Sequence, residues 1–173
     1  MKISAETYRE YITRLHDLDY KFLGQGAFGT VFEHPTFSNV AVKVVKADSA
    51  YKKYAEFCAA HKSNPWLPKI ADLVPVKLDD APRAYIVFME KLQPVKPEFI
   101  DELRESMISR FRLRRWSETQ WFDRASWRKI ASETPPAFAV IASYFANNLN
   151  SVDLTPSNFM RRGNQLVFND PMA

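Results

Sequence analysis

Apolar residues recur with two different periods along the chain, and the dominant period changes near residue 97. Before that point they alternate or form short blocks, a pattern typical of strands. The expected strands are residues 20–23, 30–32, 40–45, 70–78 and 84–89. Helical spacing is expected at residues 4–16, where Tyr8, Ile12 and Leu15 share one face, and again at residues 49–61.

Beyond Pro97 the spacing is mainly helical. Ile100, Leu103, Met107 and Phe111 recur at helical intervals. A second helix is expected from near Ser117, a third from Thr134, and a short strand at residues 165–168. A sheet followed by helices predicts an α+β protein with two lobes. We expect residues 1–90 to form an N-terminal helix and sheet, and residues 91–173 a reduced, mainly helical lobe.

Composition narrows the function classes only slightly. The 173 residues are 46% hydrophobic and carry a net charge of +4, which alone indicates neither a nucleic-acid binder nor its opposite. A single cysteine, Cys58, excludes an internal disulfide. No apolar run approaches the roughly 20 residues that cross a bilayer, and the N-terminus lacks a signal core. We therefore expect a cytoplasmic protein without a membrane partner.

Three of the four glycines lie within six residues, at Gly24, Gly26 and Gly29. Such a G-x-G-x-x-G pattern is weak evidence alone, because turns and dinucleotide folds also use it. Here strand-type residues follow, so the glycines are expected at the tip of a hairpin. Without a Cβ, backbone amides at such a tip can approach phosphate groups closely.

Lys43 lies in the middle of the apolar strand expected at residues 40–45. A buried ammonium needs an anion, and phosphate oxygens would serve; the alternative is a lysine extending from an edge strand into solvent. Glu56 is the only acidic residue between Tyr51 and His61. As a lone carboxylate beside Lys52 and Lys53, it could simply form surface pairs.

A second group of polar residues lies near the end of the sequence. Asp153 and Asn158 are five residues apart, and Asp170 follows Asn158 by twelve. Each has a simpler explanation, since Asp153 could cap a turn and Asp170 could end a strand. Their occurrence together, in order, after the glycine loop and Lys43 favours phosphoryl-transfer chemistry.

In these motifs the sequence resembles the protein kinases, and more narrowly the early serine/threonine kinases of T7-like phages. The narrower likeness includes Phe22-Leu23-Gly24, His34-Pro35, Phe57-Cys58 and Asp170-Pro171. The resemblance implies a minimal two-lobed kinase-like fold that uses ATP and Mg²⁺ in a bacterial host cytoplasm.

It also implies residue roles. Asp153, Lys43 and Glu56 would be catalytic, with Glu56 pairing to Lys43, and Asn158 and Asp170 would bind the metal. The implied nucleotide-binding residues are Gly24, Gln25, Gly26, Ala27, Phe28, Gly29, Val31, Ala41, Lys43, Met89, Glu90 and Leu92.

The sequence departs from the kinase pattern at several positions. Ser151-Val152 replaces His-Arg before the aspartate, Thr155 replaces the usual lysine, and Pro171-Met172 replaces Phe-Gly. The printed sequence ends at Ala173 without an activation segment. We therefore expect activity that is not switched by phosphorylation of such a segment.

Basic and aromatic residues alternate between residues 104 and 129. The basic residues are Arg104, Arg110, Arg112, Arg114, Arg115, Arg124, Arg128 and Lys129, and the aromatic ones are Phe111, Trp116, Trp121, Phe122 and Trp127. This mixture is compatible with binding to nucleic acid. We favour a core role for the aromatic residues; for the arginines, an acidic protein partner and nucleic acid remain equal alternatives.

Three functions follow from these features. The leading hypothesis is a minimal ATP/Mg²⁺-dependent protein kinase that modifies serine or threonine of host proteins or of itself. The first alternative is a kinase-like module, weak or inactive in catalysis, that binds and inhibits a host protein. The second is a small-molecule phosphotransferase, since such enzymes share the Asp-x-x-x-x-Asn and Asp arrangement.

Overall fold

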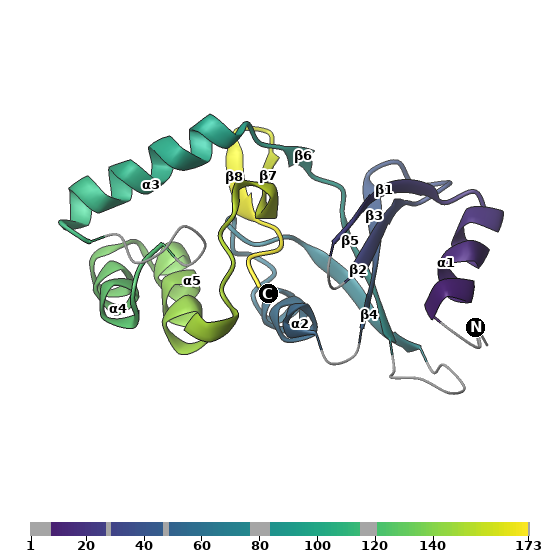
Figure 1. The fold of residues 1–173 in the computed structure, drawn as a ribbon, viewed down its shortest axis with the longest axis horizontal. Helices are drawn as coiled ribbons and strands as arrows, with labels where there is room; N and C mark the ends of the chain where they lie inside the picture. Colours follow the sequence, from purple (N-terminus) through teal and green to yellow (C-terminus); the bar gives the residue numbers. More distant parts are fainter. Residues whose placement is uncertain (1–7, 27–28, 47–48, 77–83, 115–120, 173) are drawn as a thin grey trace. The chain divides into compact units, whose positions relative to one another are not determined.

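The computed structural model describes residues 8–26, 29–46, 49–76, 84–114 and 121–172. The chain divides into two compact units, drawn in Figure 1. The first comprises Met1–Lys62 and Pro68–Lys91, and the second comprises Ser63–Leu67 and Leu92–Ala173. Among the described residues, no helix is both long and apolar enough to cross a bilayer.

The first unit contains an antiparallel five-stranded sheet, as the strand-type patterns predict. Its strands are β1 (Lys21–Gln25), β2 (Gly29–Glu33), β3 (Val40–Lys46), β4 (Ile70–Val76) and β5 (Ala84–Glu90). They are arranged in the order β1-β2-β3-β5-β4, so β3 lies in the centre. The α+β class expected from the sequence is confirmed.

Helix α1 (Tyr8–Asp17) covers one face of this sheet (Figure 1). Its buried Tyr11 and Leu15 join a cluster with Phe32, Val42 and Val44. Side chains alternate between the two faces along a strand, so Val42 and Val44 point to α1 while Lys43 points to the other side. The helix was predicted from residue 4, but its Ser4 cap lies outside the described residues.

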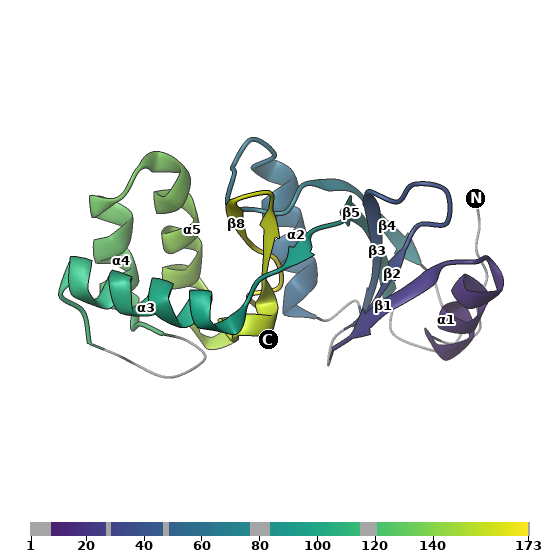
Figure 2. The same ribbon diagram turned by 90° about the horizontal axis from the view of Figure 1, so that it is seen from above.

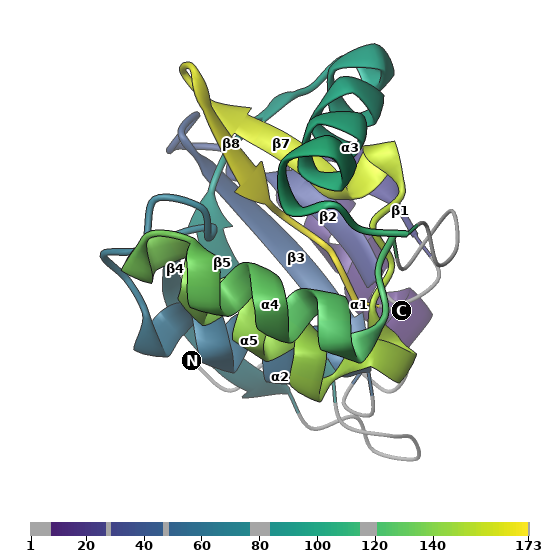
Figure 3. The same cartoon turned by 90° about the vertical axis from the view of Figure 1, so that its left-hand side faces the viewer.

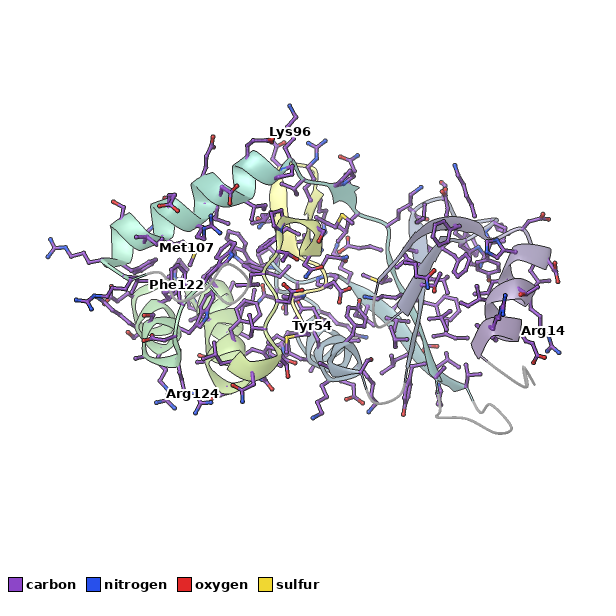
Figure 4. All side chains as sticks on the ribbon, viewed as in Figure 1. Arg14, Tyr54, Lys96, Met107, Phe122 and Arg124 are labelled. Atoms are coloured by element: carbon purple, nitrogen blue, oxygen red, sulfur yellow. The ribbon has the colours of Figure 1, made fainter. Side chains whose placement is uncertain are left out.

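Helix α2 (Ala50–Ala60) covers the opposite face of the sheet. Its buried side chains are Tyr51, Tyr54, Ala55 and Cys58, which follow one another at i, i+3, i+4 and i+7. That spacing forms a single apolar stripe on a helix. Tyr54 and Ala55 are fully buried, and Tyr54 is labelled in Figure 4.

Cys58 should be chemically inert in the folded protein. Burial raises the pKa of its thiol to about 12, and the thiolate is the reactive form. We expect no measurable reaction with a disulfide reagent such as DTNB at pH 8, and one equivalent of reaction in denaturant. Rapid native-state labelling would contradict the packing of α2 against the sheet.

Three helices dominate the second unit: α3 (Pro97–Phe111), α4 (Arg124–Glu133) and α5 (Pro136–Asn147). Helices α4 and α5 lie side by side, and α3 crosses them (Figures 2 and 3). The start of the second expected helix, near Ser117, lies outside the described residues; the helix α4 begins at Arg124. Asp123 caps it, because Asp123 Oδ1 accepts a bond from the Ser126 amide at 2.7 Å, which also lowers the pKa of Asp123.

The second unit also contains a small antiparallel sheet of β6 (Gln93–Pro94), β7 (Phe159–Arg162) and β8 (Gln165–Phe168). Two 3₁₀ turns, η1 (Leu149–Ser151) and η2 (Pro156–Asn158), precede β7. Only β8 was expected. Residues 63–67 belong here because Trp66 packs edge-on against Phe138 at 5.0 Å and its carbonyl accepts a bond from the Phe168 amide.

The aromatic residues of the segment 104–129 form the core of this unit. Trp121, Phe122 and Trp127 are fully buried, and Trp121 stacks on Phe159 with ring centroids 5.3 Å apart. Phe111 is also buried, which confirms the core role predicted for the described aromatic residues; Trp116 lies outside the described residues. In Figure 4, Phe122 lies inside the unit and Arg124 points away from it.

Candidate functional site

The central strand β3 places Lys43 among apolar neighbours. Lys43 lies opposite Val31 of β2 and Val87 of β5, and Ala41 lies opposite Met89. Directly opposed residues in antiparallel strands point to the same side of a sheet. Val31, Ala41, Lys43 and Met89, all predicted to contact a nucleotide, therefore share one face.

Lys43 is almost completely buried, with 4% of its surface exposed. Its Nζ lies 3.4 Å from the centre of the Tyr51 ring, on α2. Burying an ammonium is costly unless opposite charge or another polar group compensates it. The electron-rich face of a tyrosine ring supplies part of that compensation as a cation–π contact.

Glu56 is not brought to Lys43. Its carboxylate pairs with Lys52 Nζ at 2.7 Å, one helical turn away, and 48% of its side chain is exposed. The bond with Glu56 raises the pKa of Lys52. The predicted Lys43–Glu56 pair is therefore not formed, because Glu56 lies on the solvent side of α2 while Tyr51 faces the sheet.

The glycine-rich segment forms the β1–β2 hairpin, as predicted. Gln25 lies opposite Thr30, and the Gly26 amide donates to the Gly29 carbonyl at 2.9 Å. Ala27 and Phe28, which were predicted to contact the nucleotide, lie outside the described residues.

The three glycines of this hairpin have different surroundings. A Cβ at Gly24 or Gly26 would meet no atom within 4 Å, whereas one at Gly29 would clash with the Val44 carbonyl oxygen. Gly29 is therefore required by the packing of β2 on β3. The open space at Gly24 and Gly26 is what the approach of a phosphate to the backbone needs.

The segment predicted to contact the adenine begins at the end of β5. The Glu90 amide donates to the Lys69 carbonyl, and Glu90 Oε1 accepts from the Lys69 amide at 2.8 Å. Lys91 pairs with Glu33 at 2.8 Å, and this bond lowers the pKa of Glu33. The end of β5 is thus anchored to the rest of the first unit; Leu92 is already part of the second unit.

In the second unit, Asp153, Asn158 and Asp170 are held together by hydrogen bonds. Asn158 Nδ2 donates to the Asp153 carbonyl at 2.9 Å, and the Asn158 carbonyl accepts from the Asp170 amide at 3.1 Å. The Asp153 amide donates to the Pro171 carbonyl at 2.8 Å. The structure therefore brings these three predicted residues together.

The donor chemistry of this group fits a magnesium ion. Because Asn158 Nδ2 is bonded to Asp153, its Oδ1 points away from that carbonyl and can serve as an oxygen ligand, as can the Asp170 carboxylate. Within the described ranges no three His, Cys, Asp or Glu side chains form a cluster. Two protein ligands, Asn158 and Asp170, are enough for magnesium, because this ion commonly takes one or two protein ligands and completes its shell with phosphate and water.

Asp153 and its neighbours form a compact turn. Asp153 Oδ1 accepts from the Thr155 amide at 3.3 Å, which is the turn geometry that the sequence suggested as the simpler role of this residue. Met172 forms an isolated bridge with Val152, and both are buried. Pro171 and Met172 therefore pair with the loop that carries Asp153, and so hold the neighbouring Asp170 close to it.

In the first unit, Tyr51 is the neighbour of Lys43 that motif reasoning missed. The available signal was its position in the stripe Tyr51, Tyr54, Ala55 and Cys58, which predicts that Tyr51 faces the sheet. The stripe does not tell which strand residue the Tyr51 ring meets. That it meets Lys43 is seen only in the structure.

Comparison with protein families agrees with the kinase motifs. The family described as "Bacteriophage T7 protein kinase 0.7" matches residues 3–173. No curated protein sequence matches the chain. One solved structure that it resembles is a MAP kinase from Leishmania major, with 16% sequence identity and a TM-score of 0.42. The match covers 94% of this chain and 50% of that kinase, so the chain spans half its length.

Proposed function

Because the chain belongs to the bacteriophage T7 protein kinase 0.7 family, we propose that it is a minimal ATP- and Mg²⁺-dependent protein kinase acting on serine or threonine. Its substrates would be proteins of the bacterial host, the chain itself, or both, and it would act in the host cytoplasm. The observation that carries this proposal is the bonding of Asn158 to both Asp153 and Asp170.

Each group of residues has a distinct task in this proposal. Lys43 holds phosphate oxygens, and the open hairpin at Gly24 and Gly26 lets backbone amides approach the phosphates. Met89 and Leu92 are the proposed neighbours of the adenine. Asp153 orients the attacking hydroxyl, while Asn158 and Asp170 hold Mg²⁺, which neutralises charge on the phosphates when bound. Phosphoryl transfer depends mainly on such alignment and charge neutralisation.

Two other functions remain as alternatives to be separated by experiment. A kinase-like module without catalysis would bind nucleotide or a host protein but transfer no phosphate. A small-molecule phosphotransferase would modify a hydroxyl compound and no protein. The presence of Lys43, Asp153, Asn158 and Asp170 together supports catalysis, since a binding module has no need of all four.

The test is transfer of labelled γ-phosphate from Mg-ATP. The protein is incubated alone, with bacterial lysate, and with aminoglycosides as small hydroxylated acceptors, and products are located by mass spectrometry. Labelled serine or threonine in protein supports the proposal. Stabilisation by Mg-ATP without any transfer would favour the binding module, and label only in the aminoglycoside the second alternative.

The exposed arginines support an acidic protein as the partner or substrate. Arg110, Arg112, Arg114, Arg124 and Arg128 are exposed, whereas the described aromatic residues of the same segment are buried and cannot stack on bases. Among the two partners left open by the sequence, we therefore propose an acidic protein surface over nucleic acid.

Reversing charge at Arg124 and Arg128 should test this proposal. Arg124 lies in the first turn of α4, where glutamate suits the helix dipole, so the fold should be retained. The double change to glutamate should weaken binding of labelled polyglutamate by about tenfold at low salt, measured by fluorescence anisotropy. The control reverses Arg9 and Arg14 of α1, which changes net charge equally. The proposal would be contradicted if the Arg124/Arg128 and Arg9/Arg14 variants lost polyglutamate binding equally. It would also be contradicted if the Arg124/Arg128 variant lost binding to labelled DNA and kept binding to polyglutamate.

A further inference from the structure

The spacing of residues along α2 places Tyr51 and Glu56 on different sides of the helix. They are five residues apart, which corresponds to about 140° around a helix of 3.6 residues per turn. Tyr51 falls in the buried stripe with Tyr54, Ala55 and Cys58, whereas Glu56 falls on the exposed side with Lys53. The side of α2 that faces β3 therefore presents an aromatic ring, and not a carboxylate, to Lys43.

The contact between Lys43 and Tyr51 is close and buried. The ammonium nitrogen lies 3.4 Å from the ring centre, and Tyr51 is only 1% exposed. Cation–π attraction extends to about 6 Å and is strongest when both groups are shielded from water. The position of the ring should thus influence the position of the ammonium.

The Tyr51 ring is itself held in place at its far end. Its hydroxyl donates to Met89 Sδ at 3.5 Å, and Met89 lies opposite Ala41 on the strand next to Lys43. On the helix, the Tyr51 ring lies beside that of Tyr54, with centroids 6.2 Å apart. The ring is therefore fixed both to the sheet and to α2.

We propose that Tyr51 is the positioning residue for Lys43, in the place where a carboxylate on this helix would be expected. The inference rests on the proposed function, in which Lys43 holds phosphate. An aromatic ring attracts the ammonium but, unlike a carboxylate, carries no negative charge of its own. The contact with the ring also links the position of Lys43 to that of α2. Through the bond from the Tyr51 hydroxyl, it links Lys43 to Met89 as well.

Four variants test the role of Tyr51. Tyr51→Leu removes the ring and should lower kcat/KM for ATP by about tenfold or more. Tyr51→Phe keeps the ring and should recover most of that loss. Tyr54→Leu is the matched control, because Tyr54 is equally buried on the same helix, whereas the ring under Lys43 Nζ is that of Tyr51. Glu56→Gln should lose much less than Tyr51→Leu, since Glu56 pairs with Lys52.

A second readout does not depend on phosphate transfer. The rate at which Lys43 is acylated by an N-hydroxysuccinimide ester can be followed by mass spectrometry in every variant. We expect acylation several times faster in Tyr51→Leu than in Tyr54→Leu or Tyr51→Phe. This separates the two hypotheses: a wild-type protein that transfers no phosphate would refute the proposed function, while the labelling rates would still decide the role of Tyr51.

The inference would be overturned by either of two results. Tyr51→Leu and Tyr54→Leu could have the same kinetics and the same Lys43 labelling, which would make Tyr51 an ordinary core residue. Alternatively, Glu56→Gln could lose as much as Tyr51→Leu, which would mean that the exposed carboxylate reaches Lys43 during the reaction.

Discussion

Replacing Asp170 by asparagine is expected to reduce phosphate transfer from ATP by at least about 10²-fold, the scale on which a group that stabilises the transition-state charge acts. The change removes a negative oxygen from the proposed metal ligands but keeps the size of the side chain. The backbone bond from the Asp170 amide to the Asn158 carbonyl should remain, so the melting temperature should stay close to that of the wild type.

The dependence on magnesium should separate Asp170 from Asp153. A weakened metal site needs more Mg²⁺, so the activity left in Asp170→Asn should rise with Mg²⁺ concentration well beyond the range that saturates the wild type. Asp153→Ala removes the group proposed to orient the hydroxyl and should lose about 10² to 10⁴-fold at every Mg²⁺ concentration.

A neighbouring residue provides the control for both variants. The Asn169 amide also donates to the Asn158 carbonyl, at 2.9 Å, but no role in metal binding is proposed for its side chain. Asn169→Ala should therefore keep most of the activity. If Asp170→Asn retained normal activity with an unchanged Mg²⁺ requirement, Asp170 would not be a metal ligand and the proposed function would lose its main support.

The sequence predicts much of the first unit because its strands have a strong local signal. The block from Val40 to Val45 is apolar and β-branched, and it forms β3 as expected. The register then follows from the hairpins, so the shared face of Val31, Lys43 and Met89 could have been anticipated once the strand order was known. The order β3-β5-β4 itself depends on pairings that are distant in the sequence.

The position of Glu56 could not be deduced in the same way. The motif supplies a glutamate at a suitable distance from Lys43, but its role depends on the rotation of α2 about its own axis. That rotation is set by burial of Tyr51, Tyr54 and Cys58 against the sheet. Counting residues from a motif does not include this packing, whereas the apolar stripe along the helix does.

The second unit is harder to predict because its strands are short and pair over long distances. Gln93–Pro94 has only two residues and acquires its structure by pairing with Met160 and Arg161. The segment of Trp66 contacts Phe138 and Phe168, which lie far along the chain. By contrast, Asp153, Asn158 and Asp170 were predicted from their match to the kinase pattern. They lie near one another because the loop and the β7–β8 hairpin that join them are short.

The three glycines of the β1–β2 hairpin should respond differently to replacement by alanine. Gly29→Ala is expected to destabilise the fold by about 2 kcal/mol, the usual scale for overpacking, because its Cβ would press on the Val44 carbonyl and approach Val45 Cγ1 to 3.0 Å. Those atoms belong to the paired strand β3 and cannot move without disturbing the central ladder. The melting temperature should fall accordingly.

Gly24→Ala and Gly26→Ala should leave the melting temperature almost unchanged, since a Cβ at either position meets no atom within 4 Å. Neither glycine has the left-handed backbone that would strain an alanine. If phosphates approach this hairpin, the added methyl group occupies space that they need, and the KM for ATP should rise about tenfold or more at Gly26.

Thermal unfolding and ATP kinetics on the same three proteins would therefore divide the motif into a structural glycine and two nucleotide-binding ones. An unchanged KM in both Gly24→Ala and Gly26→Ala would show that the hairpin turns without contacting phosphate. Gly163→Ala is a suitable reference. Gly163 lies in the β7–β8 turn of the second unit with a φ of 58°, so alanine there should lower stability through backbone strain and leave the KM for ATP unaltered.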